Sequence, residues 1–207
     1  MAENLIATLA VTARDTLSAA AGMGGGPFSS AGPVHAATVT IDDDADTPSQ
    51  VSLLRPATAH EALIQVSAPA EGRVRQTLCL RFVDAHGPGK HQDLLMAASA
   101  DGAPAHHLAL PASLAGGGLY STLWLYLAGV RPILFGVRHT PRPGSDGAHT
   151  VRPGDTLDLL ACGPVAPFRR IGTIAVGTQD DGPVTFSARN SGGGLRPLPP
   201  VVFYRSR

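Results

Sequence analysis

Histidine side chains are the first residues of this sequence to consider for chemistry, because imidazoles bind metals and move protons. Three pairs are close in the sequence: His86 with His91, His106 with His107, and His139 with His149. Adjacent residues on a strand point to opposite faces of a sheet, so we expect that His106 and His107 do not share one metal ion. Histidines in turns are usually exposed to solvent. Structural roles are therefore favoured for these pairs.

The cysteines, glycine runs and serines match no catalytic motif. Cys79 lies in an apolar strand pattern and Cys162 precedes a Gly-Pro pair, and neither has the spacing of a zinc or redox site. The glycine runs at 24–26, 116–118 and 192–194 lack the Lys-Ser/Thr of a phosphate loop. No serine stands in a G-x-S-x-G elbow. We expect two buried thiols and permissive loops.

The elements that must position any site are mostly β-strands. Residues 1–23 carry apolar side chains at helical spacing and predict an N-terminal helix over 3–21. A Gly-rich linker (24–33) follows, and short β-rich runs separated by turn residues fill 34–207, which predicts one barrel domain. The candidate strands are Val34–Ile41, Gln50–Leu54, Ala62–Ser67, Thr77–Val83, Gln92–Ala97, Leu119–Tyr126, Pro132–Val137, Leu157–Ala161 and Ile171–Val176.

The composition of the chain limits the kinds of partner that it can attract by charge and the cellular locations that we expect for it. The 16 basic and 16 acidic residues balance, so no net charge attracts nucleic acid or an anionic membrane. No apolar stretch reaches the roughly 20 residues of a bilayer span, and the first residues lack the pattern of a secretory signal. We expect a cytoplasmic protein, and the wealth of Ala, Gly, Pro and Arg indicates a GC-rich, bacterial genome.

Three successive segments, 62–72, 73–82 and 92–95, resemble successive barrel strands of the catalase family in order and spacing. The likeness continues downstream in three more segments, Tyr120–Gly129, Pro167–Gly172 and Phe186–Pro197. The resemblance implies a mainly β fold, an antiparallel eight-stranded catalase-like barrel that would carry the N-terminal helix as an accessory. It also implies heme, bound between the barrel and its flanking segments.

The resemblance further implies roles for individual residues. Tyr204 matches the family's F-x-Y motif, which implies an axial ligand of the heme iron, and Arg205 and Arg207 after it would lower the pKa of this phenol. Arg81 retains the basic residue of the second strand, which implies a partner for a heme propionate. His35, in a V-H-A string, is similar to the family's V-H-A-K-G and implies the distal acid–base group.

The sequence also departs from the family pattern at several of its functional positions. Gln65 and Pro200 stand where the family keeps arginines, and residues 97–99 (Ala-Ala-Ser) stand where it places the distal Asn. If the strand after the distal motif begins at Ala37, the distal position falls near residues 26–27 (Gly-Pro) and not at His35. Efficient peroxide disproportionation is therefore not expected.

Three classes of function stay open. The first is a small heme-dependent oxidoreductase acting on an organic peroxide or another O–O or N–O substrate, in which iron cleaves the bond. The second is a heme-free barrel that serves as a binding or scaffold subunit. The third is a small-molecule carrier with an open apolar barrel. A homo-oligomer is compatible with all three.

Overall fold

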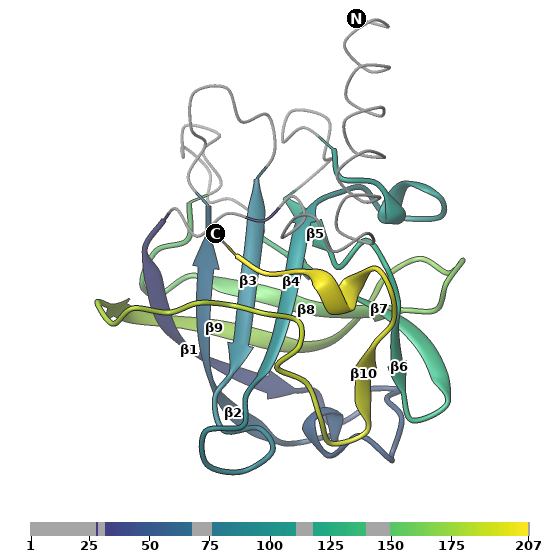
Figure 1. The fold of residues 1–207 in the computed structure, drawn as a ribbon, viewed down its shortest axis with the longest axis horizontal. Helices are drawn as coiled ribbons and strands as arrows, with labels where there is room; N and C mark the ends of the chain where they lie inside the picture. Colours follow the sequence, from purple (N-terminus) through teal and green to yellow (C-terminus); the bar gives the residue numbers. More distant parts are fainter. Residues whose placement is uncertain (1–27, 29–31, 68–75, 111–117, 140–149, 207) are drawn as a thin grey trace, which may run out of the picture.

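The computed structural model describes residues 28, 32–67, 76–110, 118–139 and 150–206, which form ten β-strands and three short 3₁₀ helices (Figure 1). The helix predicted over 3–21 and most of the predicted linker lie outside the described residues. The strands are β1 (Val34–Ile41), β2 (Ala59–Val66), β3 (Thr77–Phe82), β4 (Gln92–Ala98), β5 (Leu119–Ser121), β6 (Tyr126–Ala128), β7 (Arg131–Arg138), β8 (Thr156–Cys162), β9 (Arg169–Asp180) and β10 (Leu195–Pro197).

Eight of these strands close into an antiparallel barrel in the order β1-β2-β3-β4-β5-β7-β8-β9, with β9 pairing back to β1. Strands β6 and β10 extend the sheet beyond β7 and stand outside the closed ring. This confirms the mainly β, eight-stranded barrel that the sequence predicted. Among the described residues, no helix is both long and apolar enough to cross a bilayer.

Apolar side chains from alternate positions of every strand of the ring fill its interior. In β1, for example, Val39 and Ile41 are buried while Thr38 and Thr40 between them are exposed, as the period of a strand requires. The following interior residues are each at most 1% exposed: Val39, Ile41, Ile64, Leu78, Leu80, Phe82, Leu94, Met96, Tyr120, Phe135, Val137, Leu157, Leu159 and Ile174. The barrel is thus a packed core, and not the open apolar cup of a carrier.

Two strand predictions were wrong. Residues Gln50–Leu54 contain the 3₁₀ helix η1 (Ser52–Leu54), because Leu54 N and Arg55 N bond back to carbonyls three residues earlier. The run Leu119–Tyr126 breaks into β5 and β6 because Leu123 has a positive φ of 59°. At the break the Ser121 hydroxyl accepts a hydrogen bond from Leu123 N, which stabilises the bend.

The C-terminal segment, residues 181–206, runs across the outside of the barrel over β3 and β4 (Figure 1). It contains β10 and the 3₁₀ helix η3 (Val201–Phe203). Because this segment covers their outer face, all seven residues of β4 are buried, those pointing outward included. The remaining 3₁₀ helix, η2 (Ala105–His107), lies between β4 and β5.

Candidate functional site

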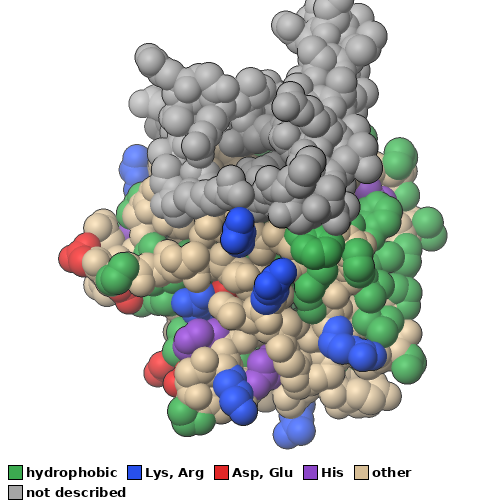
Figure 2. All heavy atoms as spheres, viewed as in Figure 1, with side chains coloured by type: hydrophobic (Ala, Val, Ile, Leu, Met, Phe, Trp, Pro, Cys, Tyr) green, Lys and Arg blue, Asp and Glu red, His purple; other side chains and the backbone are tan. Residues whose placement is uncertain are grey.

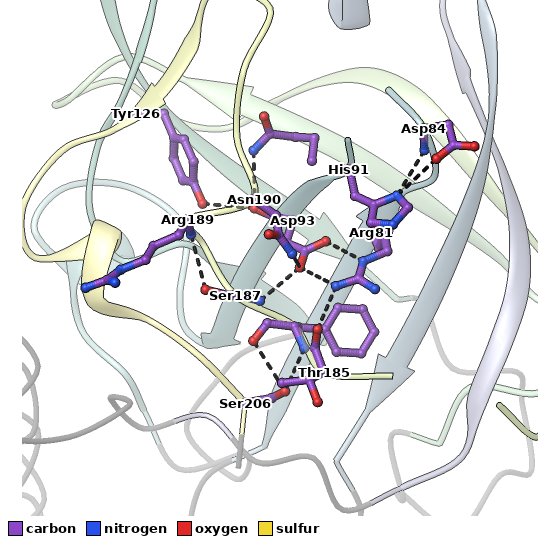
Figure 3. A network of polar contacts seen from close by, with 12 residues as sticks. Arg81, Asp84, His91, Asp93, Tyr126, Thr185, Ser187, Arg189, Asn190 and Ser206 are labelled. Atoms are coloured by element: carbon purple, nitrogen blue, oxygen red, sulfur yellow. Dashed lines mark hydrogen bonds and ion pairs between the residues drawn. The ribbon is translucent and has the colours of Figure 1, made fainter. Parts of the chain in front are cut away.

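The carboxylate of Asp93 is the centre of a buried polar network on the outer face of the barrel (Figure 3). Arg81 Nε donates to Asp93 Oδ1 and Arg81 Nη2 donates to Oδ2, both at 2.7 Å. Ser187 N and Asn190 Nδ2 of the C-terminal segment also donate to Oδ2, at 2.9 and 2.8 Å. We call these four residues, Arg81, Asp93, Ser187 and Asn190, the latch, since they join the C-terminal segment to the barrel.

Arg81 makes its hydrogen bonds through Nε and Nη2. Besides the two bonds to Asp93, its Nη2 donates to the carbonyl oxygen of Thr185 at 2.6 Å. The guanidinium also lies over the ring of Phe186, 5.2 Å from the ring centre. A buried bidentate pair of this kind is lost only at considerable cost. The structure therefore gives Arg81 a protein carboxylate where the sequence predicted a heme propionate.

Tyr204 follows η3 and is buried beneath the C-terminal segment. Its side chain is 1% exposed, and its ring is tilted against Phe28 with the ring centres 4.7 Å apart. In the described part of the chain, the phenol oxygen has no hydrogen-bond partner. Burial raises the pKa of Tyr204, so the lowering that we expected from neighbouring arginines is not found. Arg205 is exposed to solvent, and Arg207 lies outside the described residues.

His35 lies on a different surface, the inside of the barrel. It is two residues before Ala37 and pairs with Ile64, both of which are buried, and strand alternation directs all three side chains inward. His35 is 5% exposed, and neither of its ring nitrogens has a hydrogen-bond partner among the described residues. An unsatisfied buried polar group costs about 1–3 kcal/mol, so a buried imidazole of this kind is unusual.

Four more buried polar side chains occupy the same end of the interior. Gln76, Tyr120, His139 and Asp155 each lie at the end of a strand, in line with its inward-facing residues. Tyr120 Oη donates to Gln76 Oε1 at 3.2 Å, and His139 Nε2 lies 3.7 Å from Asp155 Oδ2. We call these four residues and His35 the barrel mouth.

Apart from His35, the residues of the barrel mouth were not predicted as site residues from the sequence, although a signal for them existed. Gln76 and Asp155 lie two residues before interior leucines, and His139 lies two residues after Val137. Extending each apolar alternation by one step would have placed these side chains inside. A carboxylate beside an imidazole is an arrangement that orients the ring for binding or for proton transfer.

Tyr204 and His35 are not brought together. His35 faces the interior, whereas Tyr204 belongs to a segment held against the outer face at Asp93. Asp93 is at the start of β4 and the barrel mouth is at its end, about 16 Å away at 3.3 Å per residue. His35 thus belongs to the interior, whereas Arg81 and the segment that carries Tyr204 belong to the outer face, where Arg81 is paired with Asp93. The heme-binding roles of these residues stay predictions.

Of the other histidine pairs named in the sequence, His106 with His107 is fully described, whereas His149 lies outside the described residues. His106 and His107 lie in η2 and not on a strand; their ring centres are 4.4 Å apart, and both Nε2 atoms lie about 3 Å from the carbonyl oxygen of Pro164. In the described part of the chain, no group of three or more His, Cys, Asp or Glu could hold a metal. Cys79 and Cys162 are buried free thiols, as predicted, and burial raises the pKa of Cys162 to about 12.

Comparisons with known proteins agree with the barrel architecture. No family model matches the sequence, and no curated protein does so. A fungal catalase structure matches with a TM-score of 0.55 and 8% identity, over 84% of this chain and 55% of that one. A bacterial catalase matches with a TM-score of 0.53 and 9% identity, over 84% of this chain and 54% of that one. The chain thus spans about half the length of these catalases, and at such low identity the likeness shows that its fold is catalase-like.

Proposed function

We propose that this chain is a catalase-fold binding protein whose working site is the barrel mouth, where a small hydrogen-bonding molecule contacts His35. The observation that carries the proposal is the imidazole of His35, which is buried inside the barrel with both ring nitrogens unpartnered. A ligand with one donor and one acceptor would satisfy both nitrogens and recover the cost of their burial. Other buried groups of the mouth, such as Tyr120 and Gln76, are already paired with each other.

The existing ion pair between Arg81 and Asp93 in the latch also favours a role without heme. Arg81 would have to abandon a buried carboxylate to reach a propionate, which would leave Asp93 uncompensated. Arg205 lies in solvent and does not polarise the phenol of Tyr204. The packing of the barrel does not depend on these groups, because apolar side chains form most of its interior. The heme-free binding role that the sequence left open is therefore the function that we place first.

Nitrogen NMR of protein labelled with ¹⁵N-histidine tests the proposed site. The probes are acetate, nitrite, acetamide and tert-butyl hydroperoxide, which together present anionic and neutral groups and N–O and O–O bonds. We expect saturable shifts of the His35 ring nitrogens with at least one probe. The matched control is His107, whose two ring nitrogens already contact the carbonyls of Leu123 and Pro164. If His35 responds to none of the probes, or no more than His107 does, the proposal fails.

A heme-dependent oxidoreductase is the second candidate, because the buried phenol of Tyr204 has no partner and a phenolate can ligate iron. An absorption spectrum of the purified protein, before and after hemin is added, separates the two candidates. The binding proposal expects no stoichiometric Soret band that depends on Tyr204. A one-to-one band with high-spin phenolate features, lost in Tyr204→Phe, would instead establish heme ligation and place heme chemistry first.

A further inference from the structure

The end of the sequence is strongly cationic, although the whole chain is neutral. From Gly182 to the last residue there is no Asp, Glu or Lys, but there are four arginines, of which Arg189, Arg196 and Arg205 are described. The 16 basic and 16 acidic residues of the chain are therefore unevenly distributed. All three described arginines are exposed. Their charge is presented on the outer surface of the C-terminal segment.

These arginines have no acidic partners within the described residues. The ion pairs of the described chain involve other arginines, such as Arg131 with Asp46 and Arg170 with Asp42. Asp181, at the start of the segment, accepts a hydrogen bond from Gln179, and Asp93, to which the segment is bonded, is buried and neutralised by Arg81. Figure 2 shows Lys and Arg side chains spread over the face that the C-terminal segment crosses, with acidic side chains confined to one margin.

The segment that carries the arginines is held in place. Arg205 lies opposite Ser187 in a β-bridge, and Ser187 N is bonded to Asp93. Arg189 adjoins Asn190, whose side chain is bonded to the same carboxylate. Arg196 lies in β10 and pairs with Leu127 of β6. Three backbone positions fixed in this way lower the entropic cost of binding a partner.

Apolar side chains adjoin the arginines. Arg196 pairs with Leu127, and Leu127 pairs with Pro132, so one row across β10, β6 and β7 presents a cation and two apolar groups outward. Val130, in the turn between β6 and β7, is 85% exposed. Figure 2 shows an apolar patch on this side of the same face. Protein interfaces are enriched in arginine and poor in lysine, which matches the cationic part of this surface.

We infer that this face, the three arginines with Leu127, Val130 and Pro132, docks an acidic segment of a partner protein in which Asp or Glu side chains alternate with apolar ones. Carboxylates form bidentate pairs with guanidinium groups, which complements the three unpaired arginines. Nucleic acid and anionic membranes are less well matched, because the chain as a whole carries no net charge and the arginines are interrupted by apolar groups.

Fluorescence anisotropy at physiological salt tests this inference with the full chain and a labelled peptide of repeating Glu-Leu-Glu-Phe. We expect saturable binding that weakens at least tenfold in the triple variant Arg189→Gln, Arg196→Gln, Arg205→Gln. The matched control is the triple variant Arg55→Gln, Arg152→Gln, Arg169→Gln, which removes the same charge from exposed sites outside the segment and should bind like the parent. Circular dichroism confirms that both variants keep the fold.

Three results would overturn the inference. One is the absence of peptide binding by the parent chain, and another is an equal loss in the two triple variants, which would show that only net charge matters. The third is tighter binding of a single-stranded oligonucleotide, or of phosphatidylserine vesicles, than of the peptide, which would assign the face to a different class of partner. The outcome is independent of the barrel mouth, because none of the substituted residues lies there.

Discussion

At the scale of single residues, the structure contrasts satisfied and unsatisfied buried polar groups. Asp93 accepts four donors and is paired with a guanidinium, so its burial is compensated. The nitrogens of His35 and the phenol of Tyr204 have no such partners. The two kinds of group should respond in opposite ways when their polar atoms are removed.

Replacing the latch carboxylate should be costly. Asp93→Asn leaves the Arg81 guanidinium buried without its counter-charge, and we expect a loss of about 3–5 kcal/mol in the free energy of unfolding, measured by urea titration with circular dichroism. Asp46→Asn is the control, because Asp46 is 80% exposed and its ion pair with Arg131 spans 3.6 Å. That change should cost less than about 0.5 kcal/mol. Similar losses in the two variants would contradict the structural role of the latch.

Removing the hydroxyl of Tyr204 should be harmless to the fold. Without hemin, Tyr204→Phe should leave the free energy of unfolding unchanged or raise it by up to about 1 kcal/mol, because the phenol oxygen has no partner to lose. Tyr120→Phe is the matched change, since the Tyr120 hydroxyl donates to Gln76, and it should cost about 1 kcal/mol. A larger loss at position 204 than at position 120 in urea unfolding would show that Tyr204 has a partner.

At the scale of elements, β1 and β9 approach closely where the barrel closes. Gly172 pairs with Ile41, and a β-carbon on Gly172 would collide with the carbonyl oxygen of Thr40 and lie 3.2 Å from the α-carbon of Ile41. Because the obstructing atoms are backbone, the strands themselves would have to separate. A glycine at this position is therefore a condition of closure.

Alanine substitution at Gly172 tests whether a glycine is required there for closure of the barrel. Gly172→Ala should lower the free energy of unfolding by about 1–3 kcal/mol or more, as overpacking does. Gly163→Ala is the control, since the nearest atom to its β-carbon would be Ala166 Cβ at an ordinary 4.0 Å. Thermal unfolding of both variants provides the comparison. An unchanged midpoint for Gly172→Ala would mean that β1 and β9 are less tightly paired than described.

The strands could be predicted from the sequence where one face is buried, and the breaks between them could not. The run Val34–Ile41 alternates clearly and was predicted with its observed bounds. The run 119–126 is mostly apolar, and its interruption depends on the positive φ of Leu123, which no residue type predicts. The 3₁₀ helix η1 was predicted to be a strand. Its apolar residues Leu53 and Leu54 are buried against the core, and a short apolar run of this kind does not distinguish a strand from a helical turn.

At the scale of the whole molecule, the barrel could be predicted but the arrangement of its site could not. The pairing of Arg81 with Asp93 follows from the register of β3 against β4, which the sequence does not display. Likewise, whether His35 faces inward depends on how the ring closes. The fold therefore agrees with the prediction, while the heme-binding roles of Tyr204, Arg81, Arg205, Arg207 and His35 stay predictions.

The pH dependence of global stability follows from two histidines in different parts of the barrel. Burial lowers the pKa of His60 and His106 below the ordinary value of about 6.5. The unfolded chain then binds protons more readily than the native one, so their contribution is complete above about pH 6.5 and is lost as the pH falls below it. In urea, the parent chain should lose more stability between pH 7.5 and 5.5 than the variant His60→Gln, His106→Gln. Equal slopes in the two chains would contradict this assignment.

The pairing of β1 with β9 also determines how late during synthesis the barrel can close. Ile41 of β1 is paired with Gly172 of β9. About 130 residues must therefore be translated after the first strand before its partner exists, which takes on the order of 10 s at typical translation rates. Until then β1 has an unpaired edge, and β1 to β4 can form only an open meander. The nascent chain therefore passes through an interval in which it is prone to aggregation. The exposed threonines of β1 keep the outer face of this strand polar until its edge is paired.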